Sequence, residues 1–157
     1  MEIFFNYPLM AAFWAVIFTQ LLKFPLNYLI NGRVEPLIIF SNGGMPSSHS
    51  SFTAALTTAL GIQYGLASPY FAIALVFTLI TMWDATGIRY QASKHAQLLN
   101  IMIEDFLLLI EKIKYRAASP EEFLESPLKE ILGHKPFEVF IGMLIGIGVA
   151  FFTLFFY

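Results

Sequence analysis

Long apolar segments constrain this chain more than any other feature. A membrane-spanning helix needs about 20 mostly apolar residues. Hydrophobic residues make up 57% of the 157-residue chain and charged residues only 13%, unlike a soluble domain. We therefore expect an all-α, polytopic membrane helix bundle that forms one integral-membrane domain over residues 1–157. The expected spans cover approximately residues 8–30, 48–66, 70–89 and 137–157.

The segment between the third and fourth spans, residues 90–135, differs from the rest because it carries most of the charges. Its apolar residues repeat at helical spacing between Leu98 and Ile113. This pattern predicts an amphipathic helix outside or along the membrane. A second helix is expected to start at residues 119–122, which read Ser-Pro-Glu-Glu.

The positive charges predict the orientation of the bundle. All of them fall at or on the face that carries the two longer connections between spans. By the positive-inside rule this face is cytoplasmic, and the termini and the short turn at Ala67 are outside. We expect a protein of the plasma or inner membrane. The basic residues are Lys23, Arg33, Arg89, Lys94, Lys112, Lys114, Arg116, Lys129 and Lys135.

A polar stretch, residues 41–51, interrupts the apolar pattern with two glycines, one proline, five serines and the first of three histidines. Gly44 permits a close-approaching backbone, Pro46 suits the first turn of a helix, and the serines offer donors at its N-terminus. His49 titrates near neutral pH. The stretch is either an anion-binding site or a polar turn with a serine N-cap.

Two further polar pairs lie at the ends of spans. His134 and Glu138 are one helical turn apart, so the carboxylate can hold one ring nitrogen and leave the other free. A metal pair or an interfacial cap would explain this spacing as well. Asp84 and Arg89 are five residues apart and face each other only if Gly87 loosens the turn, and a structural ion pair is an alternative.

Lys23 lies near the end of the first span, one helical turn after Gln20. Its ammonium group either snorkels to the interface or faces a polar cavity. The small-residue spacing of Gly142 and Gly146 would suit a homodimer or, as we favour, packing within the bundle.

Several kinds of chemistry are not expected. The chain has no cysteine, which excludes disulfides, thiolate chemistry and cysteine-ligated metals. It shows no basic patch interleaved with aromatic residues, so nucleic acid is not an expected partner. No paired-carboxylate metal site stands out, and we expect neither a metal nor a cofactor.

Three segments together resemble the type 2 phosphatidic acid phosphatase and vanadium haloperoxidase superfamily, most closely its small divergent membrane branch. They are residues 43–50, residues 84–89 with 97–100, and residues 133–142. The resemblance implies that a histidine attacks phosphorus and forms a phosphohistidine, while another histidine protonates the leaving group. Position by position, His134 is the expected nucleophile, His49 the general acid and Glu138 the residue that orients His134.

The resemblance also implies a phosphate site. We expect the phosphate to be bound by Lys23, Gly44, Ser47, Ser48 and Arg89, with Asp84 and Arg33 in support. Three departures from the superfamily pattern bear on this set. Leu128 stands where the superfamily has an arginine, Ser48 replaces a glycine, and Arg33 lies too far along and precedes Val34 instead of a proline. Arg89, oriented by Asp84, is the expected substitute for the missing arginine.

The expected function is metal-independent, acid-phosphatase-like hydrolysis of a lipid phosphate or diphosphate at the cytoplasmic leaflet. The alternative is a non-catalytic protein that binds or transports a lipid phosphate and has kept the anion site. A third possibility is a small structural membrane protein. The expected partners are membrane lipids and a phosphorylated lipid substrate or ligand.

Overall fold

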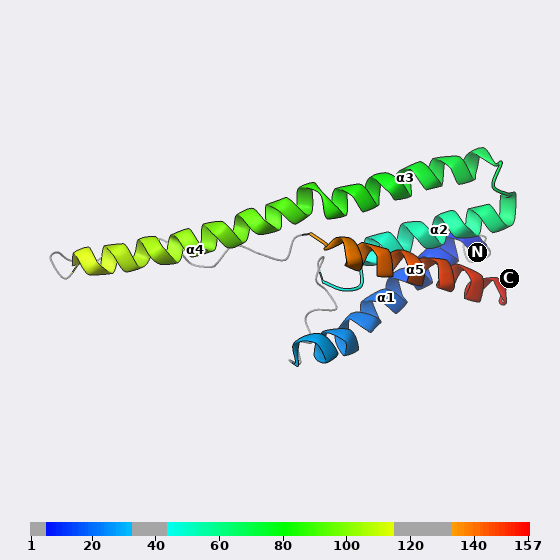
Figure 1. Cartoon of the computed structure of the whole chain (residues 1–157). Helices are drawn as coiled ribbons and strands as arrows, with labels where there is room; N and C mark the ends of the chain where they lie inside the picture. The colour runs from blue at the N-terminus through cyan, green and yellow to red at the C-terminus, as the bar shows by residue number, and fades with distance from the viewer. Residues whose placement is uncertain (1–5, 33–43, 115–132) are drawn as a thin grey trace.

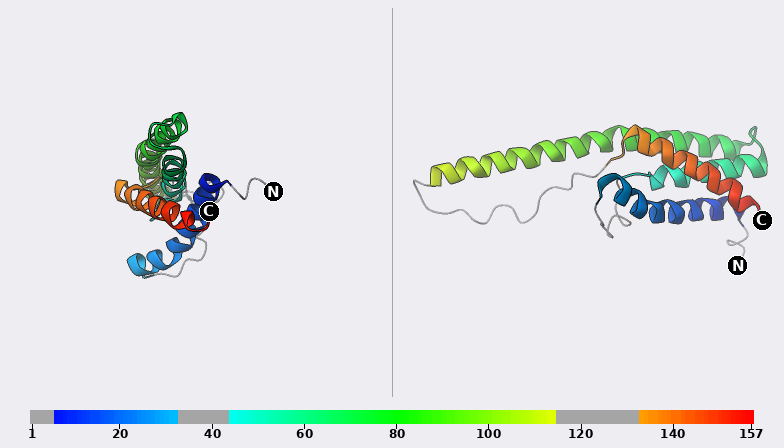
Figure 2. Two further views of the ribbon diagram at one scale, coloured as in Figure 1. Left: turned by 90° about the vertical axis from the view of Figure 1, so that its right-hand side faces the viewer. Right: turned by 60° about the horizontal axis from the view of Figure 1, so that its bottom comes forward.

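The computed structural model describes residues 6–32, 44–114 and 133–157. Within these residues the regular elements are all helices, which confirms the expected all-α class. Four of them form a bundle, and α4 extends away from it in continuation of α3 (Figures 1 and 2). The helices are α1 (Tyr7–Asn31), α2 (Ser48–Tyr64), α3 (Pro69–Thr86), α4 (Ile88–Lys114) and α5 (Pro136–Leu154).

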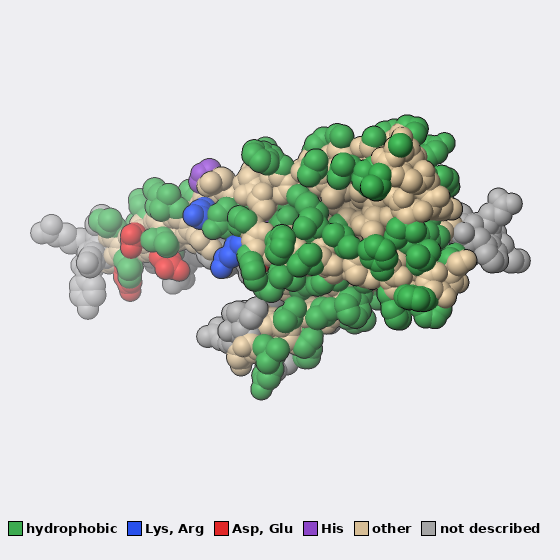
Figure 3. Space-filling view, turned by 45° about the vertical axis from the view of Figure 1, so that its right-hand side comes forward, with side chains coloured by type: hydrophobic (Ala, Val, Ile, Leu, Met, Phe, Trp, Pro, Cys, Tyr) green, Lys and Arg blue, Asp and Glu red, His purple; other side chains and the backbone are tan. Residues whose placement is uncertain are grey.

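Three helical stretches are long and apolar enough to cross a membrane: Tyr7–Leu29, Pro69–Glu111 and Pro136–Leu154. The expected second span is α2, whose 17 residues lie at the short end of the range for a spanning helix. α2 packs against α1, α3 and α5, so it is the central helix. Exposed apolar side chains cover the outside of the bundle (Figure 3), as expected of a surface that faces lipid.

Most of the buried residues in the bundle are small or bear a hydroxyl group. Gly142 and Gly146 of α5 lie against the backbone of Ser47 and Ser51, because a Cβ atom at either glycine would overlap the serine carbonyl oxygen. Such close contact lets helices associate without a large apolar core. The two glycines therefore serve packing within the bundle, as we favoured.

Hydrogen bonds between side chains connect neighbouring helices inside the bundle. The Thr19 hydroxyl of α1 donates to Ser51 Oγ of α2 over 2.8 Å. The hydroxyl oxygens of Thr57 in α2 and Thr78 in α3 are also 2.8 Å apart. These buried bonds stabilise the contacts of α2 with both helices.

One face of α1 changes in character along its length. Its buried positions recur every four residues and run from small residues to polar ones: Ala11, Ala15, Thr19, Lys23 and Asn27. The polar end of this series lies at the end of the bundle away from both termini (Figure 1). The turn between α2 and α3 lies at the same end as the termini, so the arrangement matches the connectivity expected from the sequence.

The long helix α4 confirms the amphipathic helix expected after the third span. α3 ends at Thr86, and Gly87, with φ −93° and ψ −102°, separates it from α4. The amphipathic helix therefore begins at Ile88, two residues earlier than expected. The expected helix start at residues 119–122 lies outside the described residues.

Candidate active site

Three segments meet at the end of the bundle away from the termini: the start of α2, the junction of α3 and α4, and the start of α5. The His134 N–H donates to the Ala85 carbonyl over 3.0 Å, and the Ser47 N–H donates to the Glu138 carbonyl over 3.1 Å. Gly133 packs directly against the backbone of Tyr90. Backbone contacts thus bring residues from distant parts of the chain into one site.

His134 is the most enclosed histidine of the site, with 2% of its surface exposed. Its Nδ1 lies 3.3 Å from Glu138 Oε2, which confirms the predicted pairing. Its Nε2 is buried and has no hydrogen-bond partner among the described residues. When Nδ1 carries the proton and donates it to the carboxylate, Nε2 presents a free lone pair.

Glu138 holds more than the imidazole. The same Oε2 accepts a hydrogen bond of 3.0 Å from the Lys135 N–H, which forms part of a capping box at the start of α5. The carboxylate is therefore fixed by the helix end before it orients His134. The pairing with histidine and the helix cap, which the sequence left as alternatives, are both present.

His49, the second residue of α2, lies beside His134. The two ring centroids are 6.4 Å apart and the ring planes are inclined by 58°. His49 is exposed, unlike His134. The two rings, predicted to act together from sequence positions far apart, are close enough to contact one phosphate group.

Charged groups surround the two histidines. His49 lies within electrostatic range of Lys23, Asp84 and Arg89. Lys23 in turn interacts with the charge of Glu138. Lys23 is fully buried, so its ammonium group does not snorkel to the surface and lies inside the polar end of the bundle. Its burial excludes snorkelling, one of the two alternatives that the sequence left open.

Asp84 and Arg89 form the pair that the sequence made conditional on Gly87. Arg89 Nε and Asp84 Oδ2 are 2.7 Å apart across the break between α3 and α4. Their side chains are 53% and 40% exposed, so the pair lies at the rim of the site. The interruption at Gly87 is what permits a contact at this spacing.

The polar stretch before α2 has a structural role. Ser47 is the N-cap of α2 and its hydroxyl accepts from the Ser50 N–H and the Ser50 hydroxyl. Ser48 is buried as well, and Gly44 has a φ of +83°, a left-handed conformation that favours glycine. The serine N-cap considered for this stretch is therefore present, and the phosphate contacts of Gly44, Ser47 and Ser48 stay predictions.

Comparison with known proteins gives this geometry a family. A profile described as the divergent PAP2 family matches residues 4–149. The chain belongs to the divergent PAP2 family. The chain is similar to the "Uncharacterized membrane protein YuiD" of Bacillus subtilis (strain 168). The two are 40% identical over 147 residues, which cover 94% of this chain and 93% of that protein. No solved structure matches the chain.

Membership of the divergent PAP2 family confirms the resemblance inferred from the three sequence segments, and the relative's name agrees with an integral membrane protein. Two residues that bear on the family pattern, Arg33 and Leu128, lie outside the described residues. The sequence gives Gln20 no role beyond that of a polar residue within the first span. Its buried Oε1 has no hydrogen-bond partner among the described residues, one helical turn from Lys23.

Proposed function

We propose that this divergent PAP2 protein is a membrane phosphatase that hydrolyses a lipid phosphate or diphosphate, with His134 as the nucleophile. The proposal rests on the surroundings of the two nitrogens of the His134 ring. One nitrogen contacts a carboxylate that is itself fixed by a helix cap, and the other is buried and without a partner among the described residues. A buried nitrogen with a free lone pair suits nucleophilic attack.

In the first chemical step, the lone pair of His134 Nε2 attacks phosphorus and the phosphorus–oxygen bond to the lipid breaks. The leaving oxygen takes the electron pair of that bond and a proton from His49. Glu138 stabilises the positive charge that develops on the His134 ring, because it accepts the Nδ1 proton as a hydrogen bond. The products are the free alcohol, or the monophosphate from a diphosphate, and a phosphohistidine.

In the second step, water attacks the phosphohistidine. His49, now neutral, accepts a proton from the water while the oxygen of that water bonds to phosphorus. The bond between phosphorus and Nε2 breaks, and its electron pair returns to His134. Inorganic phosphate leaves, and both histidines regain their starting protonation states.

Cationic groups at the site support phosphate binding. Lys23 is buried among the polar residues of the bundle end, and Arg89 stands at the rim, held through Nε by Asp84. A guanidinium held in this way has two further nitrogens that can donate to phosphate oxygens. Arg89 therefore takes the role of the superfamily arginine that Leu128 replaces. His49 is the exposed ring of the pair, so the phosphate reaches the site from its side.

The substrate is proposed to come from the cytoplasmic leaflet. The basic residues fall at or near the end of the bundle that carries the site, and by the positive-inside rule this end is cytoplasmic. Figure 3 shows Lys, Arg and His side chains where α4 leaves the bundle, with acidic side chains farther along α4. A reporter fused after Tyr157 tests this orientation. An external reporter is expected, and a cytoplasmic one would refute it.

The function is tested by phosphate release from purified protein in liposomes without added metal, with phosphatidate, polyprenyl phosphate and polyprenyl diphosphate as substrates. Release is expected from at least one lipid and is expected to disappear in His134→Ala and His49→Ala. His95→Ala is the matched control, since His95 is exposed on α4 outside the site. Equal release by His134→Ala and by the unchanged protein would refute the mechanism.

The second candidate is a protein that binds or transports a lipid phosphate without hydrolysing it. The observation that favours it is Leu128, which removes a cationic donor that the superfamily places near the nucleophile. It predicts saturable binding of the lipids above with no release of phosphate. The release assay separates the two candidates directly.

A further inference from the structure

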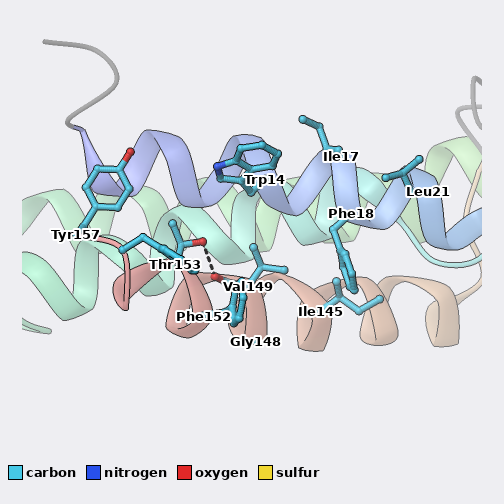
Figure 4. A pocket seen from close by; sticks show the side chains of 11 residues that line it. Trp14, Ile17, Phe18, Leu21, Ile145, Gly148, Val149, Phe152, Thr153 and Tyr157 are labelled. Atoms are coloured by element: carbon cyan, nitrogen blue, oxygen red, sulfur yellow. Dashed lines mark hydrogen bonds between the residues drawn. The ribbon is translucent and has the colours of Figure 1, made fainter. Parts of the chain in front are cut away.

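A second feature of the bundle is an apolar groove between α1 and α5, with a volume of about 1260 Å³. Figure 4 shows side chains from both helices along it. The hydroxyl of Thr153 is bonded to the Val149 carbonyl over 2.8 Å, so the lining presents almost only hydrocarbon. Its lining includes Trp14, Phe18 and Leu21 from α1 and Ile145 and Gly148 from α5.

The groove lies between two of the helices that contribute residues to the site, α1 with Lys23 and α5 with Glu138. On α5, the lining residue Ile145 is two helical turns from Glu138, so the two residues lie on the same face of that helix. At a rise of 1.5 Å per residue, the groove begins roughly 10 Å along α5 from Glu138. It is therefore positioned to take the hydrocarbon part of a molecule whose phosphate lies at the histidines.

Gly148 leaves space in the groove. A Cβ atom at this position would have no heavy atom within 4 Å, whereas one at Gly142 or Gly146 would overlap the backbone of α2. The third glycine of α5 is thus not needed for helix packing. Because Gly148 has no side chain, this part of the groove stays open on the α5 side.

The length of the groove selects among lipids. From Glu138 to Thr153, the lining residue nearest the end of α5, the distance along the helix is roughly 22 Å. Each leaflet contributes about 15 Å of the hydrocarbon core, and the acyl chains of ordinary phospholipids occupy one leaflet. A chain that runs from the site to the far end of the groove passes the midplane of the bilayer.

We infer that the groove between α1 and α5 binds a single long hydrocarbon chain, and that the phosphorylated lipid is of the polyprenyl class. This inference rests on the proposed function for the position of the phosphate. It selects against phosphatidate, whose two chains each end within one leaflet. The groove is then a specificity determinant for chain length.

Binding can be tested without turnover because Trp14 lines the groove. The chain has two tryptophans, and the second, Trp83, is exposed on α3. The Trp83→Phe variant therefore keeps Trp14 as its only tryptophan. The probe is a long polyprenyl monophosphate with a nitroxide at the end of its chain. We expect saturable quenching of Trp14 fluorescence, weakened by Gly148→Leu and unchanged by Ala72→Leu, the same kind of substitution at an exposed position of α3.

Turnover gives an independent measurement. A short prenyl phosphate, whose chain ends before the groove, is compared with the long one. Gly148→Leu is expected to lower kcat/KM for the long substrate about tenfold or more, as for small changes in an apolar pocket, and to leave the short substrate unchanged. Ala72→Leu is expected to change neither.

Three results would overturn the inference. One is quenching that does not saturate and equals that given by a nitroxide-labelled ordinary phospholipid. Another is no quenching at all, as expected if a second copy of the chain occupied the groove. The third is equal kcat/KM for both chain lengths with no effect of Gly148→Leu. Saturable quenching without phosphate release from either lipid would support the groove and refute the proposed phosphatase, so the two failures are distinguishable.

Discussion

The backbone N–H of Ser47 donates a hydrogen bond to the backbone carbonyl of Glu138 over 3.1 Å. Ser47 begins the helix that carries His49, and Glu138 orients His134. The two segments are far apart in the sequence, and this bond joins the starts of the two helices. It fixes the relative position of the two histidine rings, whose centroids are 6.4 Å apart.

The close contact between α2 and α5 predicts that alanine substitutions at two glycines of α5 differ in their effect on stability. Gly142→Ala should destabilise the fold by about 1–3 kcal/mol, because its Cβ meets the Ser47 backbone, which has no freedom to move away. Gly148→Ala, with open space around its Cβ, is the matched control. Unfolding in detergent measures both, and equal stabilities would contradict the packing described.

Glu138→Gln separates the two roles of this carboxylate. The amide oxygen can still accept from the Lys135 N–H, so the helix cap and the thermal stability should be nearly unchanged. The negative charge that stabilises protonated His134 is lost, and phosphate release should fall about 100-fold or more. Glu138→Ala, which removes cap and charge together, should lower both activity and stability. Full activity of the glutamine variant would show that the charge does not act on His134.

Arg89→Ala should reduce phosphate release about 100-fold to 1000-fold through loss of a donor to the developing charge. Its stability should change by less than about 1 kcal/mol, because the pair with Asp84 is half exposed. Lys94→Ala removes the same charge from α4, where Lys94 lies 5.0 Å from the centre of the Tyr90 ring, and serves as control. If the two variants were equally active, Arg89 would not be the substitute for the superfamily arginine.

The buried hydroxyl pair between α2 and α3 is expected to matter for stability alone. Thr57→Val, Thr78→Val and the double variant form a cycle whose coupling energy should be about 0.6 kcal/mol and no more than about 1.7 kcal/mol. Phosphate release should be retained in all three variants, since the pair lies on the α2–α3 interface away from the histidines. A coupling energy of zero would mean that the hydroxyls do not bond to each other in the membrane.

The sequence predicted those parts of the fold that depend on local pattern. The apolar segments placed α1, α3 and α5 to within a few residues, since lipid requires long uninterrupted helices. The spacing of His134 and Glu138 predicted their contact because residues four apart share a helix face. The family resemblance predicted that His49 lies beside this pair, and the two histidine rings are indeed neighbours.

The sequence could not predict features that depend on contacts between helices. Whether Lys23 points inward is decided by how α1 packs, and its hydropathy was compatible with snorkelling. Ser47 is the N-cap at the start of α2, a role that the sequence offered only as one alternative for this stretch, and its contact with phosphate stays a prediction. The groove between α1 and α5 arises from the crossing of two helices that are remote in sequence, and no local pattern encodes it.

The proposed mechanism requires that the phosphoryl group is transferred to His134, and the most direct measurement is to trap the phosphohistidine. The protein is quenched in alkali during turnover of a polyprenyl phosphate that carries labelled phosphorus, and the labelled residue is mapped by mass spectrometry. We predict label on His134, none in His134→Ala, and unchanged labelling in His95→Ala. Phosphate release at full rate with no label on His134 would contradict the claim.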